Sequence, residues 1–300
     1  MKDFELICKM SQDKLKTYLT KYIKSKYNYV TSDDGFIYAK GTFPVMLVAH
    51  MDTVHKEQVK QIIYLDNGNK ILSPQGIGGD DRVGVYSILQ IIKEYNCSVL
   101  FTEDEEIGGV GVRKFIRALA AQKIDVPKVN YLIEIDRKGN NDAVFYECDN
   151  QEFEDFILKN KEWEFEYGSY TDIVDLGPAL GVAGVNFSCG YYNAHTTNEY
   201  VVISEMHETI NKIKNLLART TEDDYFEYIE MDYGYYNYGY NNWNDSDCET
   251  KVYYISACAK KGKYIDEEVY ATSEAEAVGL FLMNHPNVCY NDLVDIFCEE

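Results

Sequence analysis

The stretch Val45-Met-Leu-Val-Ala-His50-Met-Asp52-Thr-Val-His55 decides how the rest of the chain is interpreted. Its first five residues are apolar and uncharged, which is typical of a strand that is buried on both faces of a sheet. His50 follows at the carboxyl end, where open α/β sheets collect ligands. Asp52 can accept a ring N–H from His50 and leave the other ring nitrogen free for a metal. A histidine at a strand end is also common as a structural residue, so the interpretation depends on the other strands.

Three further apolar runs predict core strands, and each is followed by acidic residues or by a histidine. These runs lie at residues 99–102, 131–135 and 185–188. Helical patterns at residues 83–95, 110–122 and 203–219 alternate with them, which indicates βαβ units. We therefore expect an α/β fold with a mixed, largely parallel central sheet flanked by helices.

The composition of the chain changes at about residue 221. Residues 221–250 are rich in Tyr, Asp, Glu and Asn and poor in aliphatic residues, which favours an acidic, Tyr-rich linker. From residue 251 two alternating runs are followed by a capping box at residues 273–276. The sequence predicts a main domain at 1–220, a linker at 221–250 and a small C-terminal α+β module of ββα type at 251–300.

The formal net charge of −21 argues against nucleic acid and anionic membrane surfaces as partners. The sequence contains no run of eighteen apolar residues, so we expect no membrane-spanning helix. The first residues lack the apolar core of a signal peptide, and the eight cysteines form no C-x-x-C pair. We expect a soluble, cytoplasmic protein.

The polar residues beyond the predicted strand ends share the chemistry of metal ligands. They are His50, Asp52, Asp80, Asp81, Glu105, Glu106, Asp136 and His195. Two imidazoles and three carboxylates can hold two divalent ions when one carboxylate bridges them, and zinc favours such N/O ligands. Each acidic segment alone would be interpreted as a solvated loop. Their gathering at four strand ends favours a site that cations neutralise.

These residues occur in motifs that resemble a known family. The motifs are His50-x-Asp52, Gly78-Gly-Asp80-Asp81-Arg-Val-Gly84, Asp104-Glu105-Glu106-x-Gly108, Asp136 and Gly190-Tyr-x-x-x-His195. In order and context they resemble the co-catalytic di-zinc exopeptidases, which include aminopeptidases, tripeptidases, glutamate carboxypeptidases and acyl-amino-acid deacylases. The resemblance covers roughly residues 1–219.

The resemblance implies a role for each metal ligand. His50 and Asp136 would hold one ion, Glu106 and His195 the other, and Asp80 would bridge the two. The implied cofactors are two Zn²⁺ ions, with Co²⁺ or Mn²⁺ as alternatives.

The resemblance also implies the groups that act beside the metals. Glu105 would be the general base, and Asp52 would orient a metal-binding histidine. The family has a cis peptide bond at the position between Asp80 and Asp81, which is costly for residues other than proline.

The chain departs from many tripeptidase-like relatives because it has no room for an inserted lid domain. Only 58 residues separate Asp136 from His195, and they already contain a predicted strand and helices. The architecture therefore resembles the single-domain aminopeptidases, although the motif around His195 is similar to that of the tripeptidases. A histidine that a lid supplies elsewhere is missing, and Tyr170, Tyr191 and Tyr192 are candidates to replace it.

Together these features predict a di-zinc metallohydrolase that cleaves peptide bonds, as an aminopeptidase or small-peptide hydrolase. An N-acyl amino-acid or amide deacylase with the same metal site is the alternative, and a catalytically inactive binding relative is a third. The expected partner is a peptide or N-acyl amino-acid substrate. Residues 251–300 are a candidate surface for a protein partner, and the sequence leaves the oligomeric state open.

Overall fold

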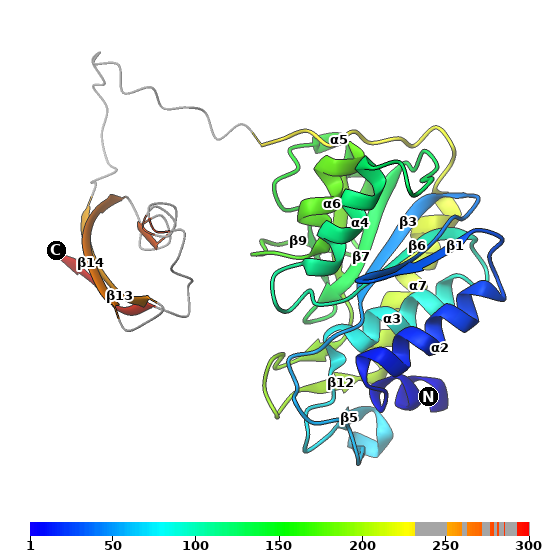
Figure 1. The fold of residues 1–300 in the computed structure, drawn as a ribbon, viewed down its shortest axis with the longest axis horizontal. Helices are drawn as coiled ribbons and strands as arrows, with labels where there is room; N and C mark the ends of the chain where they lie inside the picture. The colour runs from blue at the N-terminus through cyan, green and yellow to red at the C-terminus, as the bar shows by residue number, and fades with distance from the viewer. Residues whose placement is uncertain are drawn as a thin grey trace. The chain divides into compact units, whose positions relative to one another are not determined.

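The computed structural model describes residues 1–231, 251–259, 263–271, 277–278, 281, 285 and 293–299. The chain divides into two compact units, Met1–Tyr233 and Gly234–Glu300, and each is described by itself. Figure 1 shows the first unit as a sheet between helices.

The central sheet of the first unit has eight strands in the order β1-β2-β6-β3-β7-β10-β8-β9. Their bounds are β1 Val30–Asp33, β2 Phe36–Ala39, β3 Phe43–His50, β6 Cys97–Thr102, β7 Tyr131–Arg137, β8 Asp142–Val144, β9 Glu164–Phe165 and β10 Gly184–Ser188. The central pairs β6/β3, β3/β7 and β7/β10 are parallel, whereas β1/β2, β2/β6 and β10/β8 are antiparallel. The expected mixed, largely parallel sheet is confirmed.

The strand at residues 45–49 is buried on both faces, as its uncharged sequence predicts. Val45, Leu47 and Ala49 face one hydrophobic cluster, and Met46 and Val48 face another. Alternate side chains of a strand point to opposite faces, so a strand covered on both sides has no polar position.

Helices cover both faces of this sheet (Figure 1). The bounds are α1 Lys2–Cys8, α2 Gln12–Lys24, α3 Gly79–Ile91, α4 Val110–Ala120, α5 Gln151–Leu158, α6 Asp172–Leu180 and α7 Ile203–Arg219. Helices α1, α2, α3, α5 and α7 contribute buried side chains to one cluster, and α4 and α6 contribute to the other. Helix α1 was not predicted from the sequence.

A second sheet of the first unit carries part of the polar loops. Its strands run in the order β11-β12-β5-β4, with bounds β4 Ile63–Leu65, β5 Lys70–Leu72, β11 Tyr191–Tyr192 and β12 Tyr200–Val202. A short 3₁₀ helix, Asp66–Gly68, joins the antiparallel strands β4 and β5. The loop between β11 and β12 contains His195.

The first unit extends past residue 220 because the segment that follows packs on its core. The ring of Phe226 is buried and lies 5.1 Å from Phe153 and 6.1 Å from Tyr131, measured between ring centroids. The amide of Ala183 donates to the carbonyl of Phe226 at 2.9 Å, and the amide of Phe226 donates to Asn130 at 3.0 Å. An aromatic side chain buried in this way stabilises the fold through its large apolar area.

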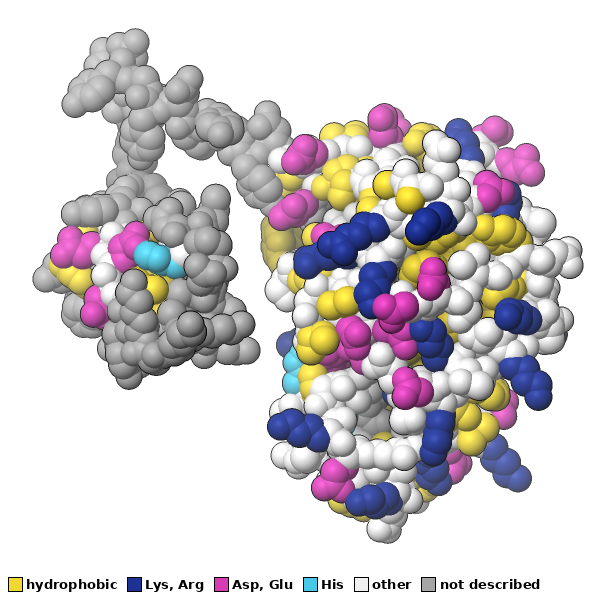
Figure 2. Space-filling model, viewed as in Figure 1, with side chains coloured by type: hydrophobic (Ala, Val, Ile, Leu, Met, Phe, Trp, Pro, Cys, Tyr) yellow, Lys and Arg dark blue, Asp and Glu magenta, His cyan; other side chains and the backbone are white. Residues whose placement is uncertain are grey.

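The surface of the first unit mixes both signs of charge. Figure 2 shows Lys and Arg side chains interspersed with Asp and Glu on the visible face. Two of the cations form ion pairs. Nε of Arg113 lies 2.9 Å from Oδ2 of Asp175, and Nζ of Lys114 lies 2.7 Å from Oδ2 of Asp34. Within the described residues, no helix combines the length and apolar character needed to cross a membrane.

The second unit contains an antiparallel sheet in the order β14-β13-β15, with β13 Lys251–Ala259, β14 Lys263–Ala271 and β15 Leu293–Glu299. Tyr253, Ile255 and Ala257 of β13 are buried with Phe281, which is helical. The expected hairpin strands are present, and β15 adds a strand that the sequence did not predict. The predicted capping box at 273–276 lies outside the described residues.

Candidate metal centre

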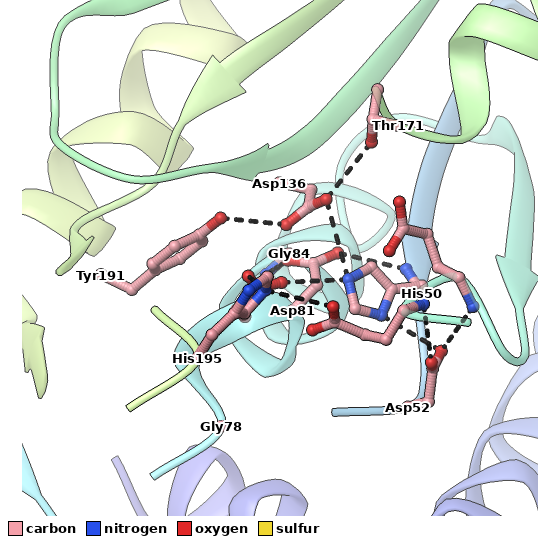
Figure 3. A network of polar contacts seen from close by, with 12 residues as sticks. His50, Asp52, Gly78, Asp81, Gly84, Asp136, Thr171, Tyr191 and His195 are labelled. Carbon is pink, nitrogen blue, oxygen red and sulfur yellow. Dashed lines mark hydrogen bonds and ion pairs between the residues drawn. The ribbon is translucent and has the colours of Figure 1, made fainter. Parts of the chain in front are cut away.

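The candidate site lies at the carboxyl ends of the central parallel strands, where the sequence placed it. His50 ends β3, Glu106 follows β6, and Asp136 lies near the end of β7. Asp80 comes from the start of α3, and His195 from the β11–β12 loop. Parallel neighbours end at the same edge of a sheet, so residues far apart in sequence converge there (Figure 3).

Asp80 lies between the two histidines and presents one carboxylate oxygen to each. Its Oδ1 is 3.0 Å from Nε2 of His50, and its Oδ2 is 3.2 Å from Nε2 of His195. A carboxylate with its two oxygens directed at two separate nitrogen donors has the geometry of a bridge between two ions.

Each of the two remaining acids lies near one of the two histidines. Asp136 Oδ2 lies 3.7 Å from Nε2 of His50, and Glu106 Oε2 lies 3.1 Å from Nε2 of His195. Ligand atoms of His50, Asp80 and Glu106 all lie within 4.8 Å of one another. The structure thus brings together all five residues that the resemblance implies as metal ligands.

Asp52 links His50 to the loop that carries the candidate base. Its Oδ1 lies 3.2 Å from Nδ1 of His50 and accepts the amide of Glu105 at 3.1 Å, while Oδ2 accepts the amide of Glu106 at 3.1 Å. The contact with Nδ1 leaves Nε2 of His50 facing Asp80, as predicted. One buried carboxylate therefore fixes both the imidazole and the backbone of the acidic loop.

Asp81 is fully buried, but its oxygens are directed at backbone amides. Oδ2 accepts from the amide of His50 at 3.2 Å and Oδ1 from the amide of Gly84 at 2.8 Å. A side chain at Gly84 would collide with this carboxylate and with the carbonyl of Ile135. The peptide bond between Asp80 and Asp81 is cis, which confirms the expectation from the resemblance.

Glu199 holds the segment that leads to Asp80, a role that was not predicted from the sequence. It is fully buried and accepts the amides of Gly78 and Asp80, both at 2.9 Å. Its Oε2 also lies 2.7 Å from Nε2 of His55. Spacing along the chain does not predict this set of contacts, because Glu199 is distant in sequence from its partners.

Asp136 is held by three neighbours that the sequence did not place. The hydroxyl of Thr171 donates to Oδ2 at 3.2 Å, and that of Tyr191 donates to Oδ1 at 3.1 Å. The side chain of Asn186 accepts the amide of Asp136 at 2.8 Å and donates to its carbonyl at 2.8 Å. Figure 3 shows the Tyr191 hydroxyl directed at Asp136. This tyrosine is thereby engaged in positioning a carboxylate.

The other two candidate tyrosines also contact acids. Tyr170 donates to Asp175 at 3.0 Å, and Tyr192 donates to Glu205 at 2.6 Å. Neither contact involves one of the five candidate ligands.

The electrostatics of the site favour bound positive charge. Burial lowers the pKa of His50, but nearby carboxylates, with Asp136 foremost, raise it well above its ordinary value. Hydrogen bonds with Asp80 and Glu106 raise the pKa of His195 to about 10. Burial and neighbouring aspartates raise the pKa of Asp136 well above its usual range. Each shift keeps a proton in the site, as expected where carboxylates crowd together.

Two observations fit this donor set to divalent cations. Oε1 of Glu106 is buried and has no hydrogen-bond partner among the described residues. The converging groups are imidazole nitrogens and carboxylate oxygens, which are the ligands that zinc accepts. Cations would replace the retained protons and occupy the side of Glu106 that lacks a partner.

Asp172 and Glu134 are two further buried acids that sequence reasoning missed. The hydroxyl of Thr102 donates to Asp172, and Glu134 accepts the amide of Ile173 at 3.2 Å. Asp172 lies in the first turn of α6 and Glu134 within β7, where the sequence indicates an ordinary helix start and a core strand.

Solved structures similar to this chain include aminopeptidases and a tripeptidase. The aminopeptidase PepT of Bacillus cereus aligns with a TM-score of 0.56 and 14% identity, covering 72% of this chain and 96% of its own. The tripeptidase of Staphylococcus aureus gives 0.52 and 14%, covering 72% and 97%. A TET aminopeptidase from a marine sediment archaeon, Thaumarchaeota archaeon, gives 0.55 and 11%, covering 73% and 96%.

These matches establish the fold class of the first unit. Over 72–73% of its length the chain shares the fold of these aminopeptidases and this tripeptidase, so the predicted resemblance is confirmed at the level of fold. No protein-family model matches the sequence, and no curated protein does.

Proposed function

We propose that the first unit is a di-zinc peptidase that acts as an aminopeptidase on small peptides. The observation that carries the proposal is Asp80, whose two oxygens face His50 and His195 at 3.0 and 3.2 Å. His50 and Asp136 would hold one ion, Glu106 and His195 would hold the other, and Asp80 would be shared by both. When bound, the two cations polarise the scissile carbonyl and acidify the attacking water.

Glu105 is the proposed proton carrier. Burial raises its pKa to about 7, and the carboxylates of Asp172, Glu106 and Asp80 add to the rise, whereas His50 opposes it. A carboxyl group that titrates near neutrality can accept a proton from water and return it to the leaving amine. Asp52 positions Glu105 by accepting its backbone amide at 3.1 Å.

Two features support an aminopeptidase in preference to a deacylase. The residue at position 136 is aspartate, as on the aminopeptidase side of the superfamily that the motifs resemble, and the chain has no lid insertion before His195. The structural neighbours PepT and the TET protein are themselves aminopeptidases.

The test is a matched pair of substrates, a dipeptide with a free amino end and the same dipeptide N-acetylated, assayed with added Zn²⁺, Co²⁺ or Mn²⁺. We expect cleavage of the free dipeptide alone. Faster cleavage of the acetylated compound identifies a deacylase. A protein that binds two metal equivalents and cleaves neither, nor any N-acyl amino acid, is the inactive binding relative.

A further inference from the structure

A cavity beside Asp52 is lined by a buried arginine, two of whose guanidinium nitrogens have no hydrogen-bond partner among the described residues. The cavity has a volume of about 230 Å³ and lies between the α1–α2 junction and the loops at 52–59 and 76–78. Its wall includes Ser11, Thr53, His55 and Arg82. A single water needs roughly 10–15 Å³ measured in the same way, so the cavity has room for a ligand of several heavy atoms.

Arg82 is the unusual member of this wall. The residue is 4% exposed, and its Nε and Nη1 are buried with no hydrogen-bond partner among the described residues. By contrast, Arg113 at the surface lies 2.9 Å from Asp175. Burying a charge is costly unless it is paired and hydrogen-bonded, so the Arg82 guanidinium calls for a partner that the described residues do not supply.

The acids near Arg82 are already engaged elsewhere. Asp52 and Asp81 are close enough to act on Arg82 through space. However, Asp52 contacts His50 and accepts two backbone amides, and Asp81 accepts two other amides. None of these hydrogen bonds involves the guanidinium, and its Nε and Nη1 have no partner among the described residues.

We propose that this cavity is a binding site for a small oxyanion, which the guanidinium of Arg82 recognises. A guanidinium presents N–H donors in a planar fork that matches two oxygens of a carboxylate or phosphate group. The exposed residues 56–58 line the same cavity and leave it a route to solvent. The cavity shares Asp52 with the metal centre as a wall residue, but the proposed anion contact is the Arg82 guanidinium, which is not one of the five candidate metal ligands.

Ser11 offers a variant that changes the charge of the cavity with little risk to the fold. It occupies the N-cap position of α2 but its side chain makes no capping hydrogen bond. Aspartate is an equally favoured N-cap residue, so Ser11→Asp adds a negative charge to the wall and keeps the helix start. Ser11→Ala, which adds no charge, is its matched control.

The experiment measures the thermal midpoint of the metal-loaded, full-length protein with sodium acetate or inorganic phosphate at constant ionic strength, with chloride as the reference. We expect a saturable rise of about 5 °C or more at about 100 times Kd, following mass action. Acetate and phosphate separate a carboxylate source from a phosphate source.

Variants assign the response to the cavity, since anions can also reach the metal centre. The wild type, Ser11→Ala and Arg113→Gln should respond, whereas Ser11→Asp and Arg82→Gln should lose the rise. Ser11→Asp and Ser11→Ala have the same metal ligands, so a difference between their anion-dependent midpoint shifts comes from the cavity. This comparison holds even if Arg82→Gln fails to fold. An unaltered response in Ser11→Asp, or no saturable rise in the wild type, overturns the proposal.

Discussion

Asp80 and Arg82 lie two positions apart at the start of α3, and their surroundings are opposite in character. Asp80 has both oxygens within 3.2 Å of imidazole nitrogens and is surrounded by acids. Arg82 is equally buried, yet two of its three guanidinium nitrogens lack a partner among the described residues. Acidic groups outnumber basic groups around Asp80, whereas Arg82 carries a positive charge without a hydrogen-bonded acid among the described residues. Under the two proposals made above, each side of the helix start binds an ion of opposite sign.

The largest expected effect is the loss of the centre in Asp80→Ala. Because one carboxylate faces both histidines, its removal should release both metal equivalents and reduce turnover to background. Metal analysis of the purified variant and a peptide assay measure the two outcomes. Asp34→Asn, which alters an exposed partner of Lys114, is the control. If the variant retains two equivalents, Asp80 is not the bridge and Asp81 becomes the first alternative.

The next largest effect should separate proton transfer from ligation. Glu105→Gln should keep both metals and lower kcat by about 10²–10⁴-fold, because the amide can no longer carry the proton. Steady-state kinetics with metal analysis measure this, and Glu57→Gln, at an exposed ion pair with Lys60, is the control. A kcat near that of the wild type would remove Glu105 from the mechanism.

A smaller effect should follow from the support beneath Asp80. Glu199→Gln should weaken metal affinity by about 10–100-fold, as changes to groups that position ligands commonly do. The reason is that a neutral amide replaces the carboxylate that accepts the amides of Gly78 and Asp80. The activity of the variant is measured while metal is titrated in, and kcat should return to the wild-type value at saturating metal.

Glu205→Gln is the control for that variant. The carboxylate of Glu205 accepts the hydroxyl of Tyr192 at 2.6 Å, a contact that involves none of the five candidate metal ligands. A kcat that stays low at saturating metal would show that Glu199 does more than position Asp80.

The smallest effect concerns stability when the metals are removed. Chelation should lower the thermal midpoint of the wild type by about 5 °C, because ligands bound only to the folded state stabilise it by mass action. The Asp80→Ala variant, already without metal, should show no shift. Calorimetry with and without chelator measures both midpoints. An unchanged midpoint in the wild type would contradict the prediction that bound cations stabilise the folded state at the acidic centre.

The predictable part of the fold was the part whose sequence pattern is local. Uncharged runs such as residues 45–49 are buried on both faces, and the amphipathic pattern after Val202 gives helix α7. Helix α1 was missed because it has only seven residues and begins without a side-chain cap. The segment with Phe226 resembled a linker in composition, and only its contacts with Phe153 and Tyr131 show that it belongs to the first core.

The predictable part of the site was the set of residues that lie next to strand ends. His50 and Glu106 were placed by the strands they follow, and the structure brings them together with Asp80. The roles assigned to them remain predictions that the variants test. Thr171, Tyr191 and Glu199 escaped prediction because each acts through a contact with a residue far away in the chain.

The sequence by itself determined the chemical groups of this protein and the order in which the strands present them. Periodicity and strand ends are local properties, so they can be deduced from neighbouring residues. Only the tertiary structure decided that Asp80 lies between two histidines, and that Arg82, in the same motif, faces a cavity instead of an acid. The physical reason is that burial forces each polar group to find partners, and which partners lie within reach depends on how distant segments pack.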